Sequence, residues 1–157
     1  MWLLISKDVQ RGFTLIELII VVALMGIVMS VSISSFLSFN KSQALQTAQL
    51  GVVNMLQQAK SEAESQVNPC STTLQKYEVK ITPPRAYELD VACSPATVSQ
   101  VSGKNLPGTL SFGGSNTIIF PIMHGLVTTG GTITIQDQSS HTQTIDVDSL
   151  GNIKYSH

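Results

Sequence analysis

The sequence predicts an α+β protein in which one long N-terminal α-helix packs on a small antiparallel β-sheet head. Two features predict this arrangement. An uncharged stretch, residues 18–40, runs directly into a segment whose apolar residues recur at intervals of three and four, the period of a helix. Residues 70–157 instead contain short runs that alternate apolar and polar residues between prolines and glycines, as strands do. A sheet packed on one apolar helix face makes a single core.

The first half of the predicted helix, residues 13–40, has the composition of a membrane segment. Its residues 18–40 carry no charge over 23 positions, and about 20 apolar residues cross the roughly 30 Å hydrocarbon core of a bilayer. Lys7 and Arg11 precede it, so the positive-inside tendency keeps the N-terminus cytoplasmic and sends the rest of the chain outward. No small-residue cleavage site follows the apolar run, unlike in a secretory signal peptide. We therefore expect a single-pass transmembrane or filament-core helix.

The second half of the helix, residues 41–68, is predicted to be amphipathic. Its expected apolar face comprises Leu45, Ala48, Val52, Met55, Leu56, Ala59 and Ala63. Its expected polar faces comprise Gln43, Gln46, Gln49, Gln57, Gln58, Lys60, Glu62 and Glu64. The pair Asn68-Pro69 stops the pattern. We expect one continuous helix from about residue 14 to about residue 66.

Residues 69–157 are predicted to form the β-rich head. The expected strands are 77–82, 86–92, 117–120, 132–136, 142–148 and 153–155, with a loop over 94–108.

Cys70 and Cys93 are the two cysteines of the chain. An even pair outside the cytoplasm favours a disulfide, which would close a 24-residue loop. On the chain-entropy model such a bridge stabilises by roughly 3 kcal/mol. The alternative is two unrelated, partly buried thiols.

One acidic side chain, Glu17, immediately precedes the uncharged stretch. An ionisable group in a membrane helix costs roughly 2.5–3.5 kcal/mol and marks a functional position by default. The residues Gly12-Phe13-Thr14-Leu15-Ile16-Glu17, followed by a long apolar helix, resemble the type III signal of type IV pilins and type II secretion pseudopilins. The resemblance implies that a prepilin peptidase cuts between Gly12 and Phe13 and that the new amine of Phe13 is methylated. Removing the leader, residues 1–12, leaves 145 of the 157 residues.

The same resemblance implies a role for Glu17 in filament docking. Cleavage creates a cationic amine at Phe13. In a low-dielectric environment this amine and a carboxylate are each unfavourable alone, but the two can pair when the carboxylate belongs to a neighbouring subunit. The alternative is that Glu17 merely snorkels to the interface. Many relatives have a proline two-thirds of the way through the apolar run, where this chain has Ser34. Expected partners are other pilin or pseudopilin subunits, a prepilin peptidase and an assembly platform in the bacterial inner membrane.

The tail of the chain resembles the head of minor pseudopilins of the GspH/FimT type. The positions that carry this resemblance are Phe120, Gly125, residues 131–135, residues 144–147 and residues 151–153. It implies a structural subunit that initiates or caps a helical filament of a type II secretion system or a type IV pilus.

The sequence leaves two other functions open. A competence minor pilin that binds extracellular DNA would need a basic face, yet beyond residue 12 there are 7 basic against 9 acidic side chains. A membrane-tethered hydrolase would need a nucleophile–base pair. We find no catalytic motif, no phosphate loop and no metal-ligand spacing, and so expect no enzyme, cofactor or metal. Asp146 and Asp148, two apart on a predicted strand, are expected on a solvated face, with a share in a calcium site as the alternative.

Overall fold

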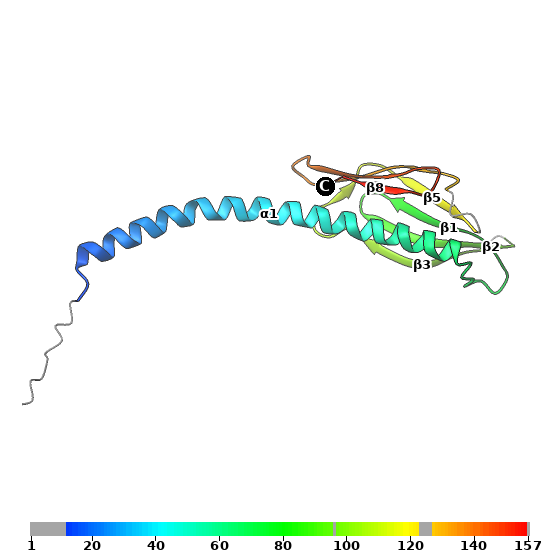
Figure 1. Ribbon diagram of the computed structural model, residues 1–157, viewed down its shortest axis with the longest axis horizontal. Helices are drawn as coiled ribbons and strands as arrows, with labels where there is room; N and C mark the ends of the chain where they lie inside the picture. Colours follow the sequence, from blue (N-terminus) through cyan, green and yellow to red (C-terminus); the bar gives the residue numbers. More distant parts are fainter. Residues whose placement is uncertain (1–11, 96, 123–126, 157) are drawn as a thin grey trace, which may run out of the picture. The chain divides into compact units, whose positions relative to one another are not determined.

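The structure is a computed structural model that describes residues 12–95, 97–122 and 127–156, without the side chains of 31–35 and 97–98. The chain forms two units with their boundary between Phe39 and Asn40. One helix, α1 (Leu15–Glu64), supplies residues to both (Figure 1). Its 50 residues agree with the predicted helix to within two positions at either end.

Residues 41–64 of α1 carry the amphipathic face that the sequence predicts. Every residue of the expected apolar face is buried, with no more than 4% of any of them exposed. The prediction was wrong for Gln49, which was assigned to a polar face but is 0% exposed. The reason is a pair of hydrogen bonds, described below, that compensate the burial of its amide.

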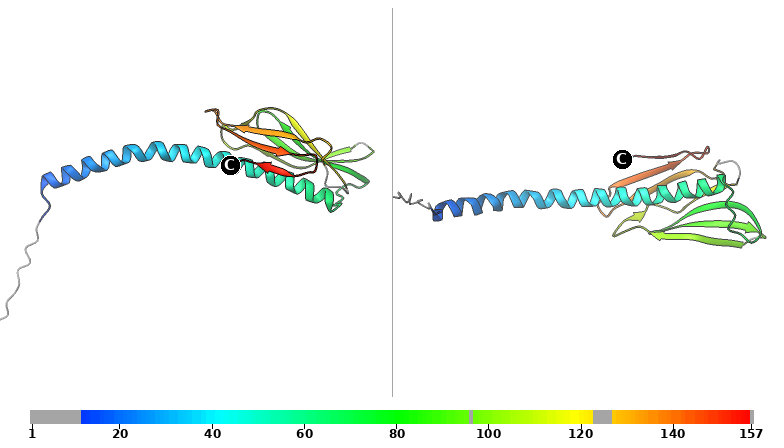
Figure 2. Two further views of the ribbon diagram at one scale, coloured as in Figure 1. Left: turned by 45° about the horizontal axis from the view of Figure 1, so that its top comes forward. Right: turned by 60° about the horizontal axis from the view of Figure 1, so that its bottom comes forward.

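The described residues of the head form eight strands in two antiparallel sheets of four. Sheet one has the order β3-β2-β1-β5, with β3 (Thr97–Asn105), β2 (Ala86–Ser94), β1 (Thr73–Thr82) and β5 (Asn116–Pro121). Sheet two has the order β4-β6-β7-β8, with β4 (Ser111–Phe112), β6 (Gly131–Gln136), β7 (Thr142–Val147) and β8 (Ile153–Tyr155). The two views of Figure 2 show both sheets beside the second half of α1.

The predicted loop over residues 94–108 was wrong, because most of it is β3. This strand pairs with β2 along its whole length, from Cys93↔Thr97 to Ala86↔Asn105. A register shift between Leu89 and Asp90 leaves one extra residue on β3. The shift breaks the two-residue period, so no alternating pattern marks the strand in the sequence.

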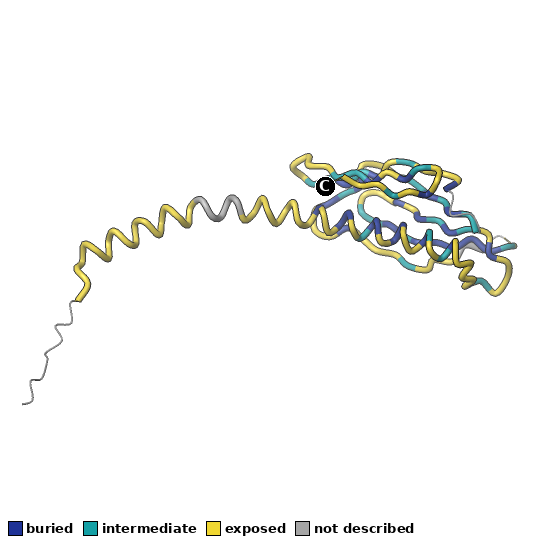
Figure 3. Tube along the Cα trace, in the orientation of Figure 1, coloured by how far each residue is buried: buried dark blue, intermediate teal, exposed yellow. Residues whose placement is uncertain are grey.

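The core lies between α1 and the inner faces of the two sheets (Figure 3). Buried positions alternate along β5, β6 and β7, whereas β2 is buried at five consecutive residues, 89–93. Sheet one contributes Tyr77, Val79, Ile81, Leu89, Val91, Ile118 and Phe120. Sheet two contributes Ile133, Ile135, Ile145 and Val147. Fully burying such side chains is worth roughly 1.5–3 kcal/mol each. The α+β prediction, a helix packed on a small antiparallel head, is confirmed.

Tyr87 and Phe112 join the two sheets edge to face, with ring centroids 6.0 Å apart. The ring of Tyr87 needs a small residue on the helix, because a Cβ added at Gly51 would lie 3.0 Å from its hydroxyl oxygen. Gly51 therefore weakens the helix locally but lets the sheet approach it closely.

The disulfide predicted between Cys70 and Cys93 is present, with their Cα atoms 6.0 Å apart. It ties the segment between α1 and β1 to the end of β2. The hydroxyl of Tyr77 on β1 donates a hydrogen bond to the carbonyl oxygen of Val67 in the same segment. The chain leaving the helix is thus held at two points on sheet one.

Candidate functional site

The first turn of α1 is capped by Thr14. Its hydroxyl accepts a hydrogen bond from the backbone N–H of Glu17 at 3.3 Å, and its carbonyl oxygen accepts one from Leu18 at 3.2 Å. Thr14 is therefore the N-cap and Glu17 the third helical residue, the Thr-x-x-Glu spacing of a capping box. A carboxylate in the first turn also interacts favourably with the helix dipole.

This cap is a local role for Glu17 that the sequence analysis missed. The signal was in the sequence, since Thr14 and Glu17 stand three apart immediately before an apolar run. The cap is compatible with docking, because it engages only the backbone N–H of Glu17 and the residue is exposed.

The predicted cleavage point lies immediately before this cap. Gly12 is exposed, and Phe13 is 87% exposed and precedes the helix. Exposed chain segments are the preferred sites of proteolytic cleavage. Arg11 and the rest of the predicted leader lie outside the described residues, so cleavage and methylation stay predictions.

The first unit exposes apolar side chains on every side of the helix. Those between residues 15 and 39 that are large, apolar and exposed are Leu15, Ile16, Leu18, Ile19, Ile20, Val21, Val22, Leu24, Met25, Ile27, Val28, Met29, Phe36, Leu37 and Phe39. A helix that is apolar all round is typically buried by other protein or by lipid. Within the described part of the chain, no helical window reaches the length and hydropathy of a membrane span. The side chain of Ser34 lies outside the described residues.

A family model described as a prokaryotic N-terminal methylation motif matches residues 7–33. The chain carries a type IV pilin-like signature. This signature indicates membrane anchoring through the N-terminus and, in general, processing by a prepilin peptidase and assembly with other pilin-like subunits. No curated protein and no solved structure matches the chain significantly. The likeness of the tail to GspH/FimT heads therefore stays a prediction, and its Gly125 lies outside the described residues.

Two polar side chains of α1 fasten the helix to sheet two. The buried amide of Gln49 donates to the carbonyl oxygens of Thr144 and Ser156, both at 3.0 Å. Its own carbonyl oxygen, Oε1, has no hydrogen-bond partner among the described residues. The ammonium of Lys60 donates to the carbonyl oxygen of Gly151 at 3.0 Å. The helix α1 is therefore bonded to β7, to the residue after β8 and to the turn between these two strands.

The acidic residues considered for calcium make other contacts. Asp146 accepts a hydrogen bond from the hydroxyl of Thr132 at 3.1 Å. Asp148 lies beyond the end of β7, so the two do not share one strand face as predicted. Its carboxylate closes the turn before β8 by accepting bonds from the N–H groups of Leu150 and Asn152, both at 2.9 Å. The side-chain amide of Asn152, which donates to the other carboxylate oxygen at 2.9 Å, lowers the pKa of Asp148, and the two backbone bonds lower it further. Among the described residues no three acidic, histidine or cysteine side chains are grouped as metal ligands.

One carboxylate in the head is buried on the outer side of sheet one. Asp90 on β2 is 8% exposed and stands opposite Glu78 on β1. Burial raises the pKa of Asp90, as do the nearby charges of Glu88 and Glu78, while Lys80 lowers it. No hydrogen bond reaches this carboxylate from the described residues. The raised pKa of Asp90 bears on the stability of the head.

Proposed function

We propose that the chain is a minor pilin or pseudopilin, a non-enzymatic structural subunit of a helical filament. It initiates or caps the filament of a type II secretion system or a type IV pilus. Its N-terminus faces the cytoplasm, residues 13–40 anchor it in a bacterial inner membrane before assembly, and the head lies in the periplasm or extracellular space. The observation that carries the proposal is the methylation motif at residues 7–33, which overlaps a helix apolar on all sides.

The exposed apolar surface of residues 15–39 needs a partner in both states of the subunit. Lipid covers it in the membrane, and the corresponding helices of neighbouring subunits cover it in the filament. Exchanging one apolar environment for the other leaves the transfer free energy of these side chains nearly unchanged. The hydrophobic surface therefore permits assembly but does not set the axial register of the subunits.

We assign that register to the amine of Phe13 and the carboxylate of Glu17. After cleavage, the amine lies one residue before the Thr14 cap and the carboxylate lies in the first turn. In low dielectric an unpaired charge is expensive, whereas a pair between adjacent subunits satisfies both groups. The pairing is available at one axial offset, which makes it a docking device.

The proposal is tested by expressing the full chain with and without an active prepilin peptidase and weighing the product. With peptidase, the chain should lose residues 1–12 and gain one methyl group on Phe13. A Gly12→Val variant, which fills the space before the scissile bond, should stay uncut, whereas Ser6→Ala in the same leader should be cut normally. An unshortened wild-type chain in the presence of active peptidase would overturn the assignment.

A further inference from the structure

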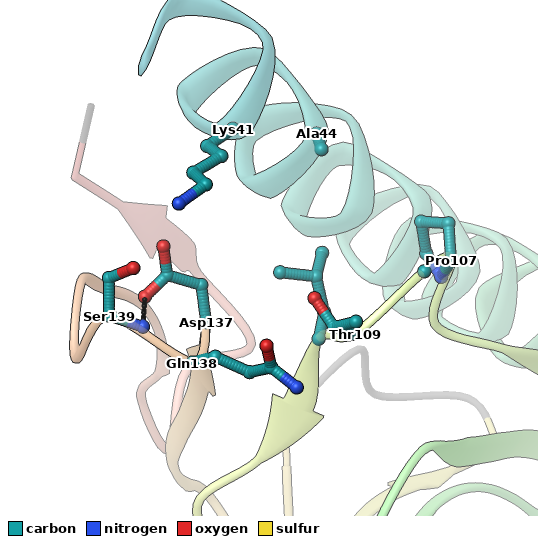
Figure 4. A pocket seen from close by; sticks show the side chains of 9 residues that line it. Lys41, Ala44, Pro107, Thr109, Asp137, Gln138 and Ser139 are labelled. Atoms are coloured by element: carbon teal, nitrogen blue, oxygen red, sulfur yellow. Dashed lines mark hydrogen bonds between the residues drawn. The ribbon is translucent and has the colours of Figure 1, made fainter. Parts of the chain in front are cut away.

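The head contains a cavity of about 230 Å³ where the second half of α1 begins. Three segments line it: Lys41 and Ala44 of α1, residues 107–110 before β4, and residues 137–139 between β6 and β7 (Figure 4). It is smaller than the roughly 300–1,000 Å³ of pockets for drug-sized ligands. Its size therefore suits a small headgroup.

Two opposite charges face each other across this cavity. In Figure 4 the ammonium of Lys41 and one carboxylate oxygen of Asp137 are directed toward each other, but no ion pair joins them. Asp137 already accepts bonds from the N–H groups of Ser139 at 2.7 Å and His141 at 2.9 Å, and its second oxygen lies 3.1 Å from the His141 ring. Two carboxylate oxygens offer about four acceptor positions, so capacity remains on the cavity side.

Further polar groups line the same space without partners. Among the described residues, the Lys41 ammonium, the Thr109 hydroxyl and the Gln138 amide take part in no hydrogen bond or ion pair. A ligand with a negative and a positive group would be complementary to Lys41 and Asp137 at once, and the hydroxyl and amide can bond to either group.

A second hollow of about 380 Å³ adjoins the cavity and shares Ala44 and Pro107 with it. Asn40, Gln43 and Thr47 complete its lining. A ligand can thus continue from the charged cavity into a neighbouring depression. Lys41 is also the first charged residue after the uncharged stretch 18–40, so along the chain the cavity directly follows the proposed membrane segment.

We propose that this cavity binds the headgroup of a zwitterionic phospholipid, with the phosphate on Lys41 and Thr109 and the ammonium on Asp137. The choice of a lipid over a free zwitterion rests on the proposed function, because membrane anchoring is what brings headgroups to Lys41. The adjoining hollow then receives the glycerol region. Binding holds the base of the head at the membrane surface until the subunit enters a filament.

The test uses the full chain in maltoside micelles and follows backbone amide NMR signals during titration with O-phosphoethanolamine. We expect saturable shifts at Thr109, Gln138 and Ser139. Ethanolamine and glycerol 3-phosphate, which each carry half of the charge pattern, should bind at least tenfold more weakly. Lys41→Gln and Asp137→Asn should each weaken binding at least tenfold. Asn at 137 keeps the oxygen that accepts the two turn N–H bonds, so the loop should persist.

Control variants test whether binding depends on the cavity, and a measurement with lipid vesicles tests whether the ligand is a lipid. Lys154→Gln and Asp146→Asn change the same charges outside the cavity and should leave binding unchanged. In vesicles, phosphatidylethanolamine should reproduce the shifts and phosphatidylglycerol should not. Absent shifts, or shifts undiminished in Lys41→Gln, would overturn the site even if the chain is processed and membrane-bound. Shifts with free O-phosphoethanolamine in a chain that does not enter vesicles would overturn the lipid source together with the proposed anchoring.

Discussion

The backbone N–H of Glu17 donates to the hydroxyl of Thr14 at 3.3 Å, so the acid that the methylation motif places in the apolar helix is also part of its N-terminal cap. Two properties of Glu17 are therefore separable. Its backbone N–H is held by the Thr14 hydroxyl, and the third helical position of a Thr-x-x-Glu spacing accepts glutamine as well as glutamate. Its charge is available for a partner.

Replacing Thr14 by alanine should fray the first turn of α1. Loss of an N-cap hydroxyl costs roughly 0.5–2 kcal/mol of helix stability. Amide hydrogen exchange in detergent micelles should speed up at Glu17 and Leu18 and stay unchanged in the head. Thr14→Ser, which keeps the hydroxyl, is the matched control. Equal exchange in all three proteins would show that the cap does not hold this turn.

Gln49→Met should destabilise the head although it puts an apolar side chain of similar size into a buried position. The carbonyl oxygens of Thr144 and Ser156 lose their donor, and a buried group left without a partner costs roughly 1–3 kcal/mol. Urea unfolding should show this loss, with faster hydrogen exchange in β7. Gln46→Met, at an exposed position of the same helix, should have little effect. Equal losses in both variants would contradict the fastening role of Gln49.

Removing the disulfide with Cys70→Ser and Cys93→Ser should lower the free energy of unfolding by about 3 kcal/mol on the chain-entropy model. Reductant should lower the stability of the wild-type head by a similar amount and leave the double variant unchanged. Urea midpoints with and without reductant give both values. A wild-type midpoint insensitive to reductant that demonstrably breaks the bond would contradict this account.

Asp90→Asn should stabilise the head at pH 7. Burial raises the pKa of Asp90 above its unfolded value, so the charged carboxylate is less stable in the folded state than in the unfolded state. Above the folded pKa this difference lowers the free energy of unfolding by its full amount. The advantage of asparagine should shrink as the pH falls through the folded pKa and vanish below the unfolded pKa of about 3.9. Urea midpoints at pH 7, 5 and 3 test this. An advantage of Asp90→Asn that stays constant from pH 7 to pH 3 would contradict this explanation.

Local patterns in the sequence were sufficient to predict the helix and most strands. Apolar residues at the helical period define one face of residues 45–63, and each of the expected core positions is buried. Period-two alternation likewise located β6 and β7 to within a residue at each end. In these elements one face contacts the core and the other contacts solvent, so the spacing of apolar residues in the sequence predicts which positions are buried.

The features that could not be predicted depend on partners distant in sequence. The strand β3 is specified by hydrogen bonds to β2 and by a register shift beside Leu89, neither of which leaves a hydrophobic pattern. Burial of Gln49 depends on carbonyl groups about 100 residues away, at Thr144 and Ser156. The cavity beside Lys41 arises where three separate segments meet. By contrast, the Thr14 cap is local and could have been found from its spacing.

The central claim is that the charge of Glu17 pairs with the amine of Phe13 on an adjacent subunit, and the most direct measurement is the fraction of each variant recovered in sheared filaments. Glu17→Gln keeps the backbone N–H that the Thr14 hydroxyl caps and removes the charge, whereas Thr14→Ala weakens the cap and keeps the charge. We predict that Glu17→Gln is processed by the peptidase but stays in the membrane fraction, and that Thr14→Ala still enters filaments. Recovery of Glu17→Gln in filaments at the wild-type level would contradict the account.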